Sequence, residues 1–206
     1  MNKSDVSIVN YGVGNISSVV NMVKRIGYMA SVVSTPSELL GAKRIILPGV
    51  GAFDAGMSKL KEYDLIAPLT ELAFEQKIPF LGICLGAQLL GKRSEEGHEP
   101  GLGWLDFQCS KFIATDKLKV PHMGWNYVER IKKCSLTEKF LEEARFYFVH
   151  SYYMDVYDSS QILFKTTYGK EFASGVVKDN IYGVQFHPEK SHKFGMQLMK
   201  NFMEIE

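Results

Sequence analysis

The chain has 206 residues, of which 46% are hydrophobic and 23% are charged, and its formal net charge is +1. This composition is typical of one globular domain, and the near-neutral charge argues against nucleic acid or an anionic membrane as the main partner. No uninterrupted apolar run is long enough to cross a bilayer. We therefore expect a single domain over residues 1–206 that contacts no membrane.

The first half of the chain alternates short apolar runs with helix-forming segments. Strands are predicted over residues 6–10, 29–33, 44–47 and 78–83. Helices are predicted over residues 16–26, 54–63, 65–76 and 85–92, with a short one opening at Pro36 and with Asn15 as the N-cap of the first. This alternation indicates a mostly parallel sheet covered on both faces, with its chemistry at the carboxyl ends of the strands.

Gly12 and Gly14 follow the first strand, where a dinucleotide-binding turn would lie. The third glycine of that fingerprint would fall at position 17, which is Ser17, and no acidic residue follows the next strand. A nucleotide is therefore not expected, and no other feature suggests a cofactor. The two glycines still indicate a close approach of the backbone to another group.

The second half is expected to add a shorter, antiparallel portion to the sheet. Strands are predicted over residues 105–112, 118–120, 126–130, 145–153, 161–167, 172–177 and 181–186. A short helix is predicted over 136–143, and a final amphipathic helix over 193–202. The expected fold class is α/β, with a mixed, mostly parallel sheet between layers of helices.

Residues 79–90, PFLGICLGAQLL, concentrate the chemical signals of the sequence. Gly82 and Gly86 flank Cys84 at the Gly-x-nucleophile-x-Gly spacing of a nucleophile elbow. Side chains at those positions would crowd a sharp turn, and the helix expected after Cys84 would favour its thiolate. For this segment alone, a buried cysteine beside two ordinary turn glycines is the alternative.

A histidine and a glutamate after the last predicted strand supply groups for proton transfer. His187 follows that strand directly, so it would lie at the same edge of the sheet as Cys84. Its imidazole can take the thiol proton and later deliver it to a leaving amine, while Glu189 accepts the other ring N–H. These three residues indicate a cysteine hydrolase or acyltransferase that acts on a small substrate.

An acyl-transfer site also needs hydrogen-bond donors for the oxyanion. The backbone N–H of Leu85, the residue after the nucleophile, is one candidate. The loop Gly49-Val50-Gly51 is another, because its glycines allow amides to turn toward a ligand. An ordinary strand-to-helix turn is an equal alternative for this loop.

The cysteine pattern and the N-terminus bear on the location of the protein. Residues 1–5 are polar and lack the apolar region of a secretory signal. Cys84, Cys109 and Cys134 form neither an even disulfide set nor a metal-ligand spacing. We expect a reduced, cytoplasmic location and no metal site.

Several blocks of the sequence resemble a known family. GICLGAQ at 82–88 with HPE at 187–189 is similar to the class I glutamine amidotransferases. PGVG at 48–51, PHMGWN at 121–126, YFVHSY at 147–152 and GVQFHPEKS at 183–191 resemble the glutaminase subunit of imidazole glycerol phosphate synthase. The blocks cover nearly the whole chain, and the resemblance implies a flavodoxin-like, three-layer α/β/α fold.

The resemblance also implies an activity, a partner and roles for particular residues. Cys84 would attack the side-chain amide of glutamine, His187 and Glu189 would transfer protons, and Gln88 would help hold the substrate. The ammonia would pass to a separate (β/α)8-barrel cyclase subunit, the heterodimer partner in histidine biosynthesis. Five residues match family positions that face the barrel: Asn15, Trp125, Asn126, Tyr147 and Lys190. His122 and His150 are expected to pack behind the site without a catalytic role.

Two departures from the family pattern leave the partner open. Ala87 stands where methionine is usual and is expected to reduce side-chain volume beside the pocket, and Asn10 stands where aspartate is common. A glutaminase that supplies ammonia for the amidination of a sugar in surface-glycan synthesis is therefore an alternative. A stand-alone cysteine hydrolase is a more distant one.

Overall fold

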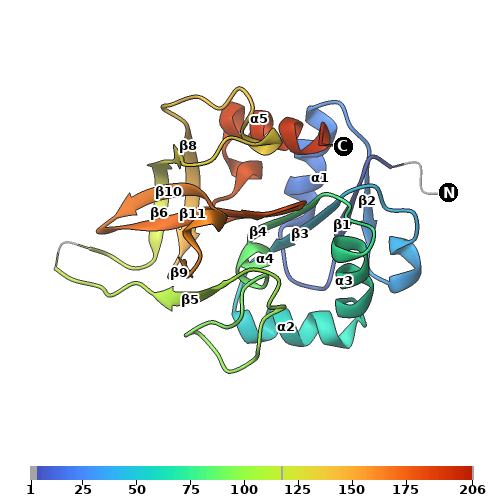
Figure 1. Ribbon diagram of the computed structural model, residues 1–206, viewed down its shortest axis with the longest axis horizontal. Helices are drawn as coiled ribbons and strands as arrows, with labels where there is room; N and C mark the ends of the chain where they lie inside the picture. Colours follow the sequence, from blue (N-terminus) through green and yellow to red (C-terminus); the bar gives the residue numbers. More distant parts are fainter. Residues whose placement is uncertain (1–3, 117, 206) are drawn as a thin grey trace.

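The computed structural model describes residues 4–116 and 118–205, so part of the polar N-terminal stretch discussed above, residues 1–3, lies outside the described residues. A ten-stranded mixed sheet forms the centre of the molecule (Figure 1). Its strand order is β2-β1-β3-β4-β12-β11-β10-β7, and β9, paired with β11, carries β5. The predicted mixed α/β fold class is confirmed.

The parallel part of the sheet comes from the first half of the chain and the last strand. It consists of β2 (Ala30–Val33), β1 (Val6–Val9), β3 (Ile45–Gly49), β4 (Phe80–Cys84) and β12 (Ile181–Val184). All except β2 are buried along their whole length, as continuous apolar runs predict for strands covered on both faces. The predicted strands are confirmed to within two residues, and β3 continues through Pro48 to Gly49.

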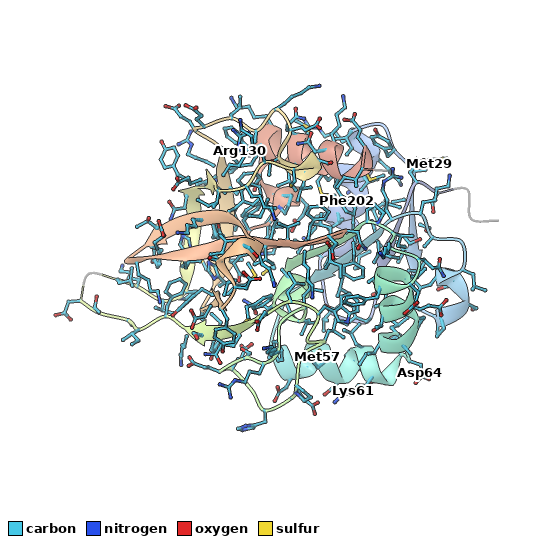
Figure 2. The ribbon with its side chains drawn as sticks, in the orientation of Figure 1. Met29, Met57, Lys61, Asp64, Arg130 and Phe202 are labelled. Carbon is cyan, nitrogen blue, oxygen red and sulfur yellow. The ribbon has the colours of Figure 1, made fainter. Side chains whose placement is uncertain are left out.

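Helices cover the two faces of this part of the sheet. Figure 1 shows α1 (Ile16–Arg25) and α5 (His192–Met203) on one face, and α2 (Phe53–Glu62) and α3 (Ile66–Phe74) on the other. Each face has its own hydrophobic core; Phe202 of α5 lies in the first and Met57 of α2 in the second (Figure 2). These helices were predicted, as was the short one at Pro36, now η1 (Pro36–Leu39). Within residues 4–116 and 118–205, no helix is both long and apolar enough to span a membrane.

The antiparallel part extends the sheet on the left of Figure 1. It consists of β5 (Phe107–Lys111), β7 (Glu129–Arg130), β9 (Tyr152–Val156), β10 (Ile162–Tyr168) and β11 (Lys170–Lys178). A separate two-stranded sheet pairs β6 (His122–Tyr127) with β8 (Arg145–His150). The single-turn 3-10 helices here are η2 (Ser135–Thr137), η3 (Ser159–Gln161) and η4 (Pro188–Lys190).

Four predictions for this region are wrong in detail. Residues 126–130, predicted as one strand, hold the end of β6 and all of β7, which lie in different sheets. The aromatic strand over 145–153 is two strands, β8 and β9, because the chain leaves one sheet for the other at Ser151. Residues 118–120 form no strand, and Leu118 makes only an isolated bridge with Thr115. The helix over 136–143 is replaced by η2: Lys139 has a φ of 53°, outside the helical region, and Nδ2 of Asn201 donates to the backbone carbonyls of residues 136 and 138.

The helix after Cys84 is also shorter than predicted. α4 (Leu85–Gln88) has one turn, and the N–H of Gly91 then donates to the carbonyl of Gln88, an i→i−3 bond. The N–H of Lys92 pairs with the carbonyl of Phe107, which draws the chain toward β5. A helix this short has a small macrodipole, so the expected stabilisation of the thiolate by the helix is reduced.

Candidate active site

The turn between β4 and α4 holds Cys84 in a strained conformation. Its φ of 54° and ψ of −112° lie in a region that residues with side chains rarely occupy. A Cβ atom on Gly86 would overlap the carbonyl oxygen of Leu47, and one on Gly82 would lie 2.7 Å from the carbonyl oxygen of Gly86. Neither glycine is an ordinary turn residue, because the turn has no room for a side chain at either position.

The turn also crosses between the two hydrophobic cores. Cys84 packs in the core beneath α1 and α5, whereas Leu85 and Ala87 pack in the core beneath α2 and α3. Ala87 is fully buried, and a Cβ on Gly183 would lie 3.2 Å from its own Cβ. Ala87 therefore packs against β12 and does not line the cavity described next. The prediction that it borders the pocket is wrong.

A cavity of about 460 Å³ lies against the sulfur of Cys84. The parallel register places the strand ends together, because Gly49 of β3 is aligned with Cys84 of β4. The residues that line the cavity include Val50, Gly51, Leu85, Gln88, His150 and His187. The structure thus brings the predicted nucleophile, the predicted base and three of the four predicted oxyanion residues to one cavity.

His187 and Glu189 form a buried pair at this cavity. Nδ1 of His187 lies 2.7 Å from Oε1 of Glu189, and the two side chains are only 1% and 2% exposed. Nε2 of His187 has no hydrogen-bond partner among the described residues. Burial alone would lower the pKa of His187, but its interactions with Cys84 and Glu189 outweigh burial and raise that pKa to about 9. The site therefore favours an imidazolium beside the sulfur.

Tyr11 supports the strand that carries the predicted oxyanion loop, and sequence reasoning missed it. Its side chain is fully buried, and its hydroxyl has no hydrogen-bond partner in the described part of the chain. A Cβ on Gly49 would lie 2.6 Å from that hydroxyl, so Gly49 is needed for the contact. Burial, and then the nearby charge of Cys84, raise the pKa of Tyr11. The close backbone approach expected at Gly12 and Gly14 is not seen, because a Cβ on either would meet its neighbours at ordinary distances of 3.5 Å or more; both glycines instead have a positive φ.

Two buried glutamines connect the cavity wall to the sulfur. Nε2 of Gln88 donates to the backbone carbonyl of Tyr152 at 3.2 Å and to Oε1 of Gln185 at 3.0 Å. Nε2 of Gln185 in turn lies 3.9 Å from the sulfur of Cys84. Sequence reasoning missed Gln185, although its place between β12 and His187 was a usable signal. A donor at the sulfur stabilises a thiolate without a long helix.

The comparisons with known proteins agree with this geometry. The sequence profile described as "Glutamine amidotransferase class-I" matches residues 7–205. The chain belongs to the class I glutamine amidotransferases. It is 52% identical over 198 residues to "Imidazole glycerol phosphate synthase subunit HisH 2" of Pseudomonas aeruginosa, with 96% of this chain and 98% of the relative covered. A protein of the same name from Methanococcus maripaludis is 51% identical over 199 residues, with 97% and 98% covered.

Solved structures with lower identity support the same fold. The structure titled "Crystal structure of glutamine amidotransferase" has a TM-score of 0.76 at 20% identity, and 97% of each chain is covered. A chain of PurLQS from Thermotoga maritima has a TM-score of 0.73 at 18% identity, with 96% of each chain covered. The chain is thus an amidotransferase enzyme in both sequence and fold.

The five residues predicted to face a partner lie at three separate places in this amidotransferase. Trp125 of β6 is aligned with Tyr147 of β8, their ring centroids are 6.4 Å apart, and Nζ of Lys190 lies 5.6 Å from the Tyr147 ring. We call these three residues the aromatic patch. Asn15 is exposed at the start of α1, where its side chain caps the helix. The side chain of Asn126 lies on the face of β6 opposite Trp125, and its amide donates to the Thr167 carbonyl at 2.9 Å.

Proposed function

We propose that this amidotransferase is the glutaminase subunit of an imidazole glycerol phosphate synthase, and that it acts in histidine biosynthesis in the cytoplasm. Two relatives printed as "Imidazole glycerol phosphate synthase subunit HisH 2" share about half of its sequence over nearly their whole length. The observation that carries the chemistry is the strained Cys84 and the buried His187–Glu189 pair at one cavity. The substrate would be glutamine, and the products glutamate and ammonia.

In the first half of the reaction, the sulfur of Cys84 attacks the side-chain amide carbon of glutamine. The C–S bond forms, and the carbonyl oxygen becomes an oxyanion that backbone N–H groups of Val50, Gly51 or Leu85 would stabilise. His187, which its environment keeps protonated, gives its proton to the amide nitrogen as the C–N bond breaks. Ammonia leaves, and a glutamyl thioester remains on Cys84.

In the second half, water hydrolyses the thioester. The neutral imidazole of His187 now takes a proton from the attacking water, and Glu189 stabilises the imidazolium that forms. The tetrahedral intermediate expels the sulfur, which returns to Cys84 as a thiolate beside the imidazolium. The short bond from Nδ1 of His187 to Glu189 keeps Nε2 as the atom that exchanges protons in both halves.

The proposed partner is a (β/α)8-barrel cyclase subunit that consumes the ammonia. The aromatic patch supports a partner contact close to the catalytic residues, because the backbone carbonyl of Tyr147 accepts a hydrogen bond from the backbone N–H of His187 at 2.9 Å. Aromatic side chains are enriched in the buried centres of protein interfaces. Direct transfer across such a contact is favourable, since ammonia released into water is readily protonated and loses its nucleophilic lone pair.

The proposal is tested by glutamine hydrolysis with the purified chain, alone and with the barrel subunit and its ligand. We expect low activity alone, a large rise in the complex, and loss of that activity in Cys84→Ser. Rescue of a histidine auxotroph tests the pathway separately. Intact glutaminase activity without rescue would favour a partner that amidinates a sugar, whereas activity on peptides and none on glutamine would overturn the proposal.

A further inference from the structure

A continuous series of hydrogen bonds runs from the two-stranded sheet of β6 and β8 to the sulfur of Cys84. Its outer half begins at Asn126 of β6, whose Nδ2 lies 3.2 Å from Nε2 of His122. Nδ1 of His122 lies 2.9 Å from Nε2 of His150, and Nδ1 of His150 lies 2.7 Å from the carbonyl oxygen of Tyr152. We call Asn126, His122, His150 and the Tyr152 carbonyl the histidine relay.

The direction of every bond in the relay is fixed by backbone groups at its two ends. A carbonyl oxygen only accepts, so Nδ1 of His150 carries the proton, and Nε2 of a neutral His150 must accept from Nδ1 of His122. At the other end, the Asn126 amide donates to the carbonyl of Thr167 while its oxygen accepts the N–H of Tyr127 at 2.8 Å. Asn126 therefore presents a donor to His122, and both histidines hold their proton on Nδ1.

The relay meets the cavity at the carbonyl of Tyr152. That oxygen accepts from Gln88 as well as from His150, so it fixes the side-chain amide of Gln88. The orientation of Gln88 sets that of Gln185, whose remaining donor is directed at the sulfur of Cys84. No bond in this path can be reversed without placing two donors or two acceptors in contact.

The surroundings of the two histidines keep them neutral and aligned. His122 is stacked between the rings of Phe148 and Tyr168, with centroids 4.7 Å and 4.0 Å away. Burial lowers the pKa of His122 to about 4 and is the main reason why the pKa of His150 falls to about 3. With pKa values this low both rings are weak bases near neutral pH, and their nitrogens are already paired within the relay, so we assign them no proton transfer in the reaction.

We propose that His122 and His150 are positioning residues for glutamine hydrolysis. They hold the carbonyl of Tyr152, and through it they fix the Gln88 amide at the substrate cavity. This inference rests on the proposed glutaminase activity and goes beyond it, because packing alone requires neither ring nitrogens nor one tautomer. Loss of this positioning should raise the KM for glutamine and leave kcat nearly unchanged.

The kinetic test compares three variants in the complex with the barrel subunit and its ligand. His122→Phe keeps the ring stack but removes both nitrogens, so we expect the KM for glutamine to rise about tenfold with kcat changed less than threefold. His122→Asn can place its amide where Nδ1 was and still donate to His150, so its KM should stay near the wild-type value. Tyr168→Phe is the matched control, with a KM expected near the wild-type value. It keeps the stack on His122 and removes only a hydroxyl that donates outside the relay, to the carbonyl of Lys119.

The KM values of these variants relative to the wild type decide the outcome. An unchanged KM in His122→Phe, or an equal rise in His122→Asn, would overturn the proposal, because packing alone would then explain both. If His122→Phe fails to fold, His122→Asn and ¹⁵N NMR of the wild-type histidines decide. We expect the assigned rings of His122 and His150 to be protonated on Nδ1 only and unchanged between pH 6 and 8, and a proton on Nε2 of either ring would refute the relay. The NMR result stands even if the wild type proves inactive on glutamine, which would contradict the proposed function instead.

Discussion

Replacement of Glu189 by glutamine tests the proposed proton-transfer pair most directly. The substitution keeps the shape of the side chain but removes its charge from a site where carboxylate and imidazole are 2% and 1% exposed. A buried hydrogen bond to a charged group is worth about 1.5–3 kcal/mol. Since about 1.4 kcal/mol corresponds to a tenfold change in rate, kcat for glutamine should fall by about 10- to 150-fold.

The pH dependence of the same variant gives a second, independent measure. Glu189 is one of the interactions that raise the pKa of His187 to about 9, so its loss should lower that pKa. His187 must be protonated to release ammonia, and activity should therefore decline as the pH rises through its pKa. In Glu189→Gln, the decline of kcat/KM on the alkaline side should begin at a lower pH than in the wild type, because kcat/KM reports the free enzyme.

Steady-state glutaminase assays between pH 6 and 10 measure both effects. Glu204→Gln is a matched control, because Glu204 is about half exposed at the end of α5 and lies 3.8 Å from Lys200. This control should leave kcat and the pH profile unchanged. A kcat for Glu189→Gln within threefold of the wild type, with the same alkaline limb, would refute the role assigned to the pair.

Three further predictions concern stability. Gly86→Ala should lower the free energy of unfolding by about 3 kcal/mol, because its Cβ would overlap the Leu47 carbonyl; urea unfolding measures this, and a loss below 1 kcal/mol would contradict the described turn. Asn15→Ala removes the cap of α1 and should cost about 1 kcal/mol, visible as a lower Tm; an unchanged Tm would show that the cap contributes nothing. His122 and His150 have folded pKa values near 4 and 3, below the ordinary 6.5, so the unfolded chain binds more protons between those values. The free energy of unfolding should therefore fall as the pH drops from 6.5 toward 3, by at most about 1.4 kcal/mol per pH unit for each histidine, and a flat profile in urea titrations would contradict this.

The parallel half of the fold could be predicted from sequence because its signals are local. Buried strands such as β1 and β4 are continuous apolar runs, and Asn15 caps α1 through a bond to the N–H of Ser18, only three residues away. The spacing of the glycines around Cys84 is equally local, and the clash that Gly82 avoids lies within the turn itself. The clash that Gly86 avoids is with the carbonyl of Leu47 on β3, a distant segment, so the sequence indicated the glycine but not the contact that requires it.

The remaining features depend on segments that are far apart in the sequence. Where a helix was predicted over 136–143, the carbonyls of residues 136 and 138 accept from Asn201 of α5, and after the short helix at Cys84 the N–H of Lys92 pairs with Phe107. The roles of Tyr11 and Gln185 are each defined by a contact with a segment far away in the sequence, Gly49 of β3 for Tyr11 and Gln88 of α4 for Gln185. No periodicity in the sequence encodes these contacts.

The crossing of the elbow between the two cores has a consequence for how variants of this protein are interpreted. Cys84 is seated in one core and Leu85 in the other, so a packing change beneath any of the four large helices can tilt the sulfur. Interiors this dense transmit small displacements over several residues. A survey of substitutions should therefore find well-folded but inactive proteins scattered through both layers, many of them distant from the catalytic pocket.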